Sequence, residues 1–178
     1  MRSAVIVNLF GVPGAGKSTG AAYIFYRLKA SGINAELVTE FAKDKVWENN
    51  EEVFKNQAYI FGKQSFKIGR CVDKVEVIVT DSPLPLSILY NNDSKLTESF
   101  NRSVMDVFNS YDNMNYLLVR TKPYNPSGRM QTEKESDALY EQIRQLLCIR
   151  EIQHENVDGD LSGYEYIVGK VLRRLVEY

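Results

Sequence analysis

The feature that most constrains this chain is a glycine-rich run of eight residues between an apolar stretch and a helical pattern. The run matches G-x-x-x-x-G-K-[ST], in which glycines let successive backbone N–H groups converge on phosphate oxygens. It consists of Gly11, Val12, Pro13, Gly14, Ala15, Gly16, Lys17 and Ser18, and Thr19 follows directly. These nine residues are predicted to bind the phosphates of a nucleoside triphosphate.

The residues on either side of this loop also fit a phosphate-binding loop between a strand and a helix. Ala4 to Phe10 is an almost unbroken apolar run, the pattern of a strand buried on both faces of a parallel sheet. Beyond the loop, Ala21, Ile24 and Leu28 recur at helical spacing, and Gly32 is a suitable helix stop. A glycine turn without a ligand is the alternative, but the strand–loop–helix context favours phosphate binding.

Strands and helices are expected to alternate along the rest of the chain. Further strands are predicted at 34–39, 75–80 and 116–119 and within 149–157. Helices are predicted at 51–71 and 100–111, and two more follow the capping-box pairs Thr132 with Glu135 and Ser162 with Glu165. This order predicts an α/β fold of the three-layer P-loop NTPase type, with a parallel sheet of about five strands and helices on both faces.

Composition limits the possible partners and compartments. The 178 residues fit one domain, 1–178, without a separating linker, and the net charge of −1 disfavours nucleic acid as an extended partner. No run approaches the roughly 20 apolar residues of a membrane span. Two cysteines are too few for a disulfide framework, and the start of the chain does not resemble a signal peptide. We therefore expect a cytoplasmic protein with no membrane partner.

Three residues are expected on the nucleotide and metal side of the site. Lys17 should reach the β- and γ-phosphates of ATP and take part in catalysis, and the Ser18 hydroxyl should bind Mg²⁺. Asp81 closes an apolar strand, where a carboxylate can hold a magnesium-bound water. The alternative for Asp81 is a helix cap ahead of the next turn. ATP and Mg²⁺ are thus the predicted cofactors.

The acceptor side is predicted around Glu40 and a Pro/Gly-rich loop. Glu40 follows the second strand at the carboxyl edge of the sheet, where it can accept the proton of a substrate hydroxyl. Arg120, Lys122 and Arg129 surround the loop, and Arg129 and Arg120 are predicted to screen the transferring phosphate from a lid at about 121–132. The alternatives are a surface carboxylate and solvated basic residues.

Other nucleotide-dependent classes fit less well. The chain has no N-K-x-D segment for reading guanine, which argues against a switch GTPase. A motor ATPase needs a further lid domain, for which 178 residues leave little room. A compact kinase remains.

The order of these segments resembles the small ribosylnicotinamide-kinase-like P-loop family, which is also similar to deoxynucleoside kinases and is often labelled AAA-like ATPase. The resemblance rests on the phosphate loop, Glu40 to Asp44, the helix carrying Gln57 and Gln64, and Asp81. It implies that Glu40 lies on the acceptor side and that the acceptor is a small nucleoside or nucleotide. Lys43 departs from the arginine usual in such relatives. The two glutamines can also read a base.

We therefore expect transfer of the γ-phosphate of ATP to a hydroxyl or phosphate of a nucleoside- or nucleotide-like acceptor. A polynucleotide 5′-hydroxyl kinase is the first alternative, although near-neutral charge argues against it. The second is a regulatory module that binds and slowly hydrolyses ATP to control a protein partner. The sequence leaves the oligomeric state open.

Overall fold

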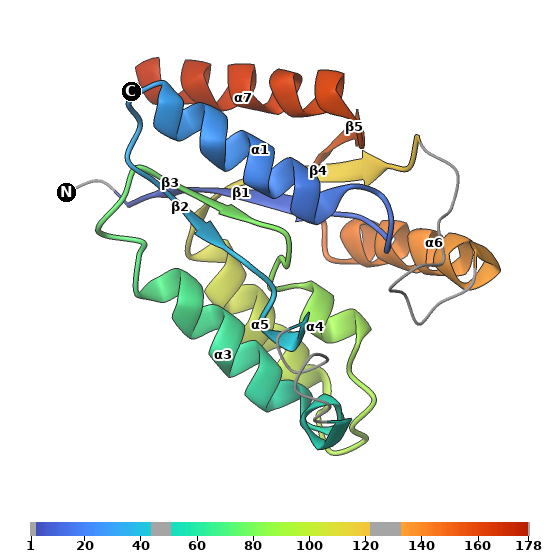
Figure 1. Cartoon of the computed structure of the whole chain (residues 1–178). Helices are drawn as coiled ribbons and strands as arrows, with labels where there is room; N and C mark the ends of the chain where they lie inside the picture. The colour runs from blue at the N-terminus through green and yellow to red at the C-terminus, as the bar shows by residue number, and fades with distance from the viewer. Residues whose placement is uncertain (1–2, 44–50, 122–132, 178) are drawn as a thin grey trace.

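A five-stranded parallel sheet forms the centre of the computed structural model, which describes residues 3–43, 51–121 and 133–177 (Figure 1). The strands are β1 (Val5–Phe10), β2 (Ala35–Val38), β3 (Val77–Thr80), β4 (Asp112–Val119) and β5 (Glu155–Asp158). Their order across the sheet is β2-β3-β1-β4-β5, and every pairing is parallel. All carboxyl ends therefore meet at one edge, which is where open α/β sheets bind ligands.

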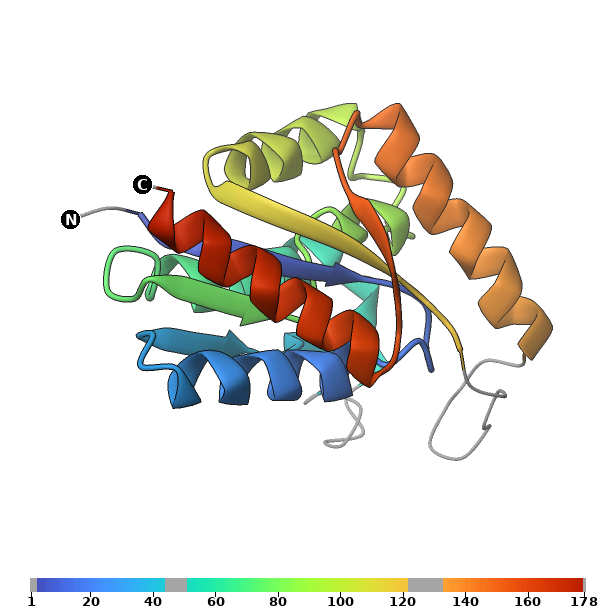
Figure 2. The same ribbon diagram turned by 90° about the horizontal axis from the view of Figure 1, so that it is seen from above.

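Helices cover both faces of the sheet. The helical segments are α1 (Lys17–Ala30), η1 (Glu51–Lys55), α3 (Gln57–Gly69), α4 (Leu86–Leu89), α5 (Glu98–Asn109), α6 (Glu133–Ile149) and α7 (Leu161–Val176). Helices α1 and α7 lie side by side on one face, while α3, α4, α5 and α6 lie on the other (Figures 1 and 2). This confirms the predicted α/β fold with helices on both faces. Among the described helices, none is long and apolar enough to cross a membrane.

The apolar first strand occupies the middle of the sheet, and all six of its residues are buried. Strand β4 begins four residues earlier than predicted, because its polar start is also paired. Asn8 of β1 donates to Asn113 Oδ1 and Asn115 Oδ1 at 2.9 and 3.0 Å. This side-chain ladder satisfies polar groups beside the buried central strand, a pairing that hydrophobic periodicity cannot reveal.

Near the carboxyl end, the predicted capping box was wrong, and the predicted short strand is present with shifted bounds. The capping box of Ser162 and Glu165 does not form, because Asp160 is the N-cap of α7 and accepts from the Gly163 N–H at 3.1 Å. Glu165 contacts Tyr23 and Arg27 on α1 instead. The short strand expected within 149–157 is present as β5, which overlaps the end of that range and extends one residue beyond it. Thr132 lies outside the described residues.

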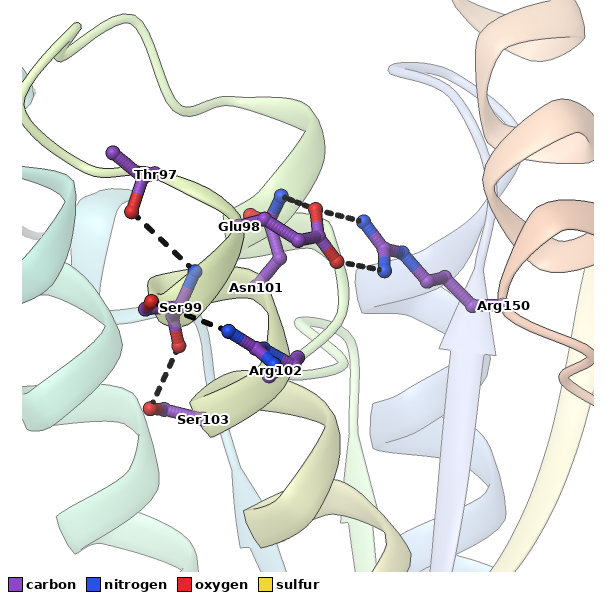
Figure 3. A network of polar contacts seen from close by, with 7 residues as sticks. All are labelled: Thr97, Glu98, Ser99, Asn101, Arg102, Ser103 and Arg150. Atoms are coloured by element: carbon purple, nitrogen blue, oxygen red, sulfur yellow. Dashed lines mark hydrogen bonds and ion pairs between the residues drawn. The ribbon is translucent and has the colours of Figure 1, made fainter.

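A charged clamp joins α5 to the carboxyl end of α6. Glu98 in the first turn of α5 accepts from both terminal nitrogens of Arg150, at 2.6 and 3.1 Å (Figure 3). Asn101 donates to the same carboxylate at 2.8 Å. Hydrogen bonds from Arg150 and then from Asn101 are the main reasons that the pKa of Glu98 is lowered to about 2. The clamp holds the amino end of α5 against the carboxyl end of α6.

Candidate active site

The phosphate loop turns from β1 into α1 through glycines with positive φ angles. Gly11, Gly14 and Gly16 have φ of 149°, 89° and 92°, which side-chain-bearing residues rarely adopt. Gly16 is the N-cap of α1, and the first turn of that helix carries no acidic residue. The first amides of α1 and the positive end of its dipole are thus available to an anion.

Lys17 folds back over this loop. Its Nζ donates to the carbonyl oxygen of Gly11 at 2.7 Å and to that of Val12 at 3.2 Å. The ammonium group is therefore held at the mouth of the loop by neutral acceptors. A phosphate oxygen forms a stronger, charge-assisted hydrogen bond and can replace them.

Ser18 and Asp81, the two residues predicted to bind Mg²⁺, are hydrogen-bonded to each other. The Ser18 hydroxyl donates to Asp81 Oδ2 at 2.6 Å, and Asp81 is only 4% exposed. Both groups are hard oxygen donors of the kind that Mg²⁺ prefers; Ser18 lies in the first turn of α1, and Asp81 directly follows β3. Across the described ranges there is no cluster of three or more His, Cys, Asp and Glu side chains. The pair fits an ion that takes its remaining ligands from phosphates and water.

Asp81 also holds the backbone at Glu40, the residue predicted to lie on the acceptor side. Its Oδ1 accepts from the backbone N–H of Glu40 at 3.0 Å, so one buried carboxylate connects the ends of β2 and β3 to Ser18. This explains why Asp81 tolerates burial, since both oxygens are hydrogen-bonded. It also means that the metal-side and acceptor-side residues are positioned together.

A cavity of about 310 Å³ opens beside this cluster. It is lined by Ser18, Ala21, Ala22, Leu37, Thr39, Glu40, Lys43 and Asp81. Its volume lies in the range of small-molecule sites, and its wall contains both polar and apolar side chains. Glu40 and the Ser18–Asp81 pair therefore face the same cavity.

Glu40 has an aromatic neighbour, Tyr90, just after α4. Burial first, and then the negative charge of Glu40, raise the pKa of Tyr90 to about 12. The tyrosine hydroxyl thus stays protonated near neutral pH and can donate to a ligand or to Glu40. No sequence motif pointed to Tyr90, because its proximity to Glu40 depends on how β3 and α4 place it.

Gln64 of α3 holds the backbone at Phe41, directly after Glu40. Its Oε1 accepts from the Phe41 N–H at 3.0 Å, and the side chain is 3% exposed. Phe41 also packs edge-on against Tyr59, with ring centroids 5.7 Å apart. The side-chain oxygen of Gln64, one of the two glutamines that could also read a base, therefore holds the backbone beside Glu40.

Of the predicted lid at about 121–132, only residue 121 is among the described residues. Arg120 follows β4 and pairs with Asp137 of α6, with Nη2 and Oδ1 at 2.9 Å. Residues 122–132, which include Lys122 and Arg129, lie outside the described residues. The roles of Arg120 and Arg129 in catalysis stay predictions.

One residue against the phosphate loop was missed in the sequence. The Tyr164 hydroxyl of α7 lies 3.0 Å from the carbonyl oxygen of Gly16 and 3.0 Å from that of Gly159. Gly159 belongs to the turn after β5, which reaches the loop directly. Only the shared helical face of Tyr164, Ile167 and Val171 signalled that this side of α7 faces inward.

Comparisons with known proteins support the fold. No protein-family model and no curated protein matches the chain significantly. A solved structure of the NadR protein in complex with NR aligns over 96% of this chain, with a TM-score of 0.66 and 17% identity; the chain spans 51% of that protein. A structure of deoxyadenosine kinase from M. mycoides, with dCMP and a flexible dCDP bound, aligns over 97% of this chain and 100% of its own length. Its TM-score is 0.55 and its identity 18%. The chain therefore has a fold shared with P-loop kinases.

Proposed function

We propose that this protein is an ATP-dependent kinase that transfers the γ-phosphate to a nucleoside- or nucleotide-like acceptor. One observation carries the proposal: Ser18, Asp81 and Glu40 line a single cavity, and Asp81 is hydrogen-bonded to both other residues. Two residues that could bind a metal and one that could act as a base thus line a single space with the volume of a small-molecule site. We take residues 1–178 as one catalytic domain.

The chain's own residues suit the steps of such a transfer. The α1 amides and Lys17 bind and orient the phosphates, with Lys17 leaving the Gly11 and Val12 carbonyls for phosphate oxygens. Mg²⁺ held by Ser18 and Asp81 would neutralise charge on the β- and γ-phosphates. An acceptor hydroxyl oxygen bonds to the γ-phosphorus while the bond to the β–γ bridging oxygen breaks and ADP leaves. Glu40 takes the hydroxyl proton.

The likeness to a deoxyadenosine kinase and to NadR supports an acceptor of nucleoside size. The apolar part of the cavity wall, formed by Ala21, Ala22 and Leu37, suits the flat face of a sugar or base. We infer that this wall excludes water from the acceptor hydroxyl, so that transfer outruns hydrolysis.

Two alternatives make different predictions for the same assay. A polynucleotide 5′-hydroxyl kinase would phosphorylate short oligonucleotides and leave nucleosides unchanged. A regulatory ATPase would use Glu40 to orient water and would turn over ATP without an acceptor. The test is ADP formation from Mg²⁺·ATP with nucleosides, nucleoside monophosphates, nicotinamide riboside or oligonucleotides, with mass analysis of the product.

A further inference from the structure

Tyr164 lies in the first turn of α7 and is only 5% exposed. The turn is fixed by the Asp160 cap, and the Tyr164 N–H donates to the carbonyl oxygen of Asp160 at 3.0 Å. The ring extends toward α1, where a Cβ added at Gly20 would lie 2.5 Å from Tyr164 Cε1. Tyr164 is therefore packed between the two helices of one face, directly behind the phosphate loop.

The Tyr164 hydroxyl joins two backbone segments that are distant in sequence. Its distances to the carbonyl oxygens of Gly16 and Gly159 are equal, at 3.0 Å, so a single proton serves both acceptors. The segments touch each other as well, since a Cβ added at Gly159 would lie 2.0 Å from the Ala15 carbonyl oxygen. The phosphate loop and the β5–α7 turn are thus braced as one unit.

The orientation of one peptide plane gives this brace a consequence for ligand binding. In a trans peptide the C=O and N–H bonds point in opposite directions. The carbonyl of Gly16, held by Tyr164 and by the Gly20 N–H at 2.7 Å, shares its peptide unit with the Lys17 N–H. Fixing that carbonyl toward α7 aims the Lys17 N–H the other way, into the phosphate loop.

We propose that Tyr164 is a positioning residue of the phosphate loop, whose hydroxyl holds the Gly16–Lys17 peptide in the orientation that binds nucleotide phosphate. The inference rests on the proposed function. Burial, and secondarily the charge of Asp160, raise the pKa of Tyr164, so the hydroxyl remains a donor at physiological pH. Replacement by phenylalanine keeps the ring that fills the space beside Gly20 and removes only this donor.

The test compares Tyr164→Phe with Tyr23→Phe, a matched control on the same helix pair. The Tyr23 hydroxyl bonds Glu165 of α7 and accepts from Arg27 at 3.1 Å, so the control also loses an interhelical hydrogen bond. Neither of these two contacts involves the phosphate loop. Calorimetry gives the Kd for Mg²⁺·ADP, and thermal unfolding shows that each variant is folded. Amide hydrogen exchange in the nucleotide-free protein measures how well the backbone N–H groups of residues 15–18 are protected.

We expect Tyr164→Phe to raise the ADP Kd about tenfold and to speed exchange in the segment 15–18, while Tyr23→Phe changes neither by more than about twofold. The KM for ATP should rise with little change in the KM for the acceptor. An unchanged Kd and unchanged exchange in Tyr164→Phe overturn the inference, and so does an equal loss in both variants. If the unsubstituted protein does not bind ADP, the proposed function fails first and this role fails with it.

Discussion

Replacing Gly159 with alanine tests the contact between the β5–α7 turn and the phosphate loop. The added Cβ would lie 2.0 Å from the carbonyl oxygen of Ala15 and 3.0 Å from that of Val119. Ordinary contact begins near 3.4 Å, so the turn and the loop must separate by about 1.4 Å. Both obstacles are backbone atoms that cannot rotate away as a side chain does. The strain should therefore reach about 3 kcal/mol, the upper part of the usual range for overpacking.

In a chain of this size about 3 kcal/mol corresponds to a fall in Tm of roughly 6–12 °C. The displaced Ala15 belongs to the phosphate loop, so the Kd for Mg²⁺·ADP should also rise at least about tenfold. The control is Gly62→Ala in α3, where an added Cβ meets nothing within 4 Å. That change should raise the Tm slightly, because alanine favours a helix interior over glycine. A Gly159→Ala protein that melts and binds ADP like the unsubstituted protein would refute the contact.

Three further predictions concern the metal pair, the candidate base and the α5–α6 clamp. Asp81→Asn should raise the magnesium concentration needed for half-maximal activity at least about tenfold, because an amide replaces a charged ligand; an unchanged magnesium titration would exclude Asp81 from the metal site. Glu40→Gln should lower kcat by about 10²–10⁴ with little change in ADP affinity, since its backbone bond to Asp81 remains; full activity would remove Glu40 as the base. The pKa of Glu98 is lowered to about 2, so its contribution to stability is present above about pH 4.5 and is lost as the pH falls toward 2. Unfolding measured across this range should show a smaller loss in Glu98→Gln, and identical profiles would contradict the role of the Arg150 pair.

Features that depend on neighbouring residues in the sequence were predictable. The phosphate loop lies where its glycine pattern and the flanking strand and helix required, and five parallel strands form the sheet. The approach of Asp81 and Glu40 to Ser18 followed from the sheet alone, because parallel strands end at one edge. For these residues, local patterns and one rule of topology were sufficient.

Features that depend on contacts across the fold were not predictable. The bonds of Asn8 to Asn113 and Asn115 extend β4 into a segment whose polar residues gave no strand signal. The cap of α7 moved to Asp160, since Glu165 is taken up by partners on α1. In each case a side chain found a partner far away in the sequence, and local spacing could not identify it.

The role of Tyr164 was hidden for the same reason. Its hydroxyl lies within hydrogen-bond distance of the carbonyl oxygens of Gly16 and Gly159. Every residue has a backbone carbonyl, so the residue types at these positions do not reveal the contact. Gly20 carries a faint signal, because a glycine inside a helix often marks a close approach. The sequence shows the gap at Gly20 but cannot show that a tyrosine from the last helix fills it.

The most direct test of the account is ATP consumption with Mg²⁺ in the presence and absence of a panel of small acceptors and oligonucleotides. The account predicts slow turnover alone and a steep rise with one nucleoside or nucleotide, accompanied by a product heavier by one phosphoryl group. Equal turnover in every reaction would contradict phosphoryl transfer to an acceptor and would favour a regulatory ATPase. Stimulation by oligonucleotides alone would contradict the small acceptor.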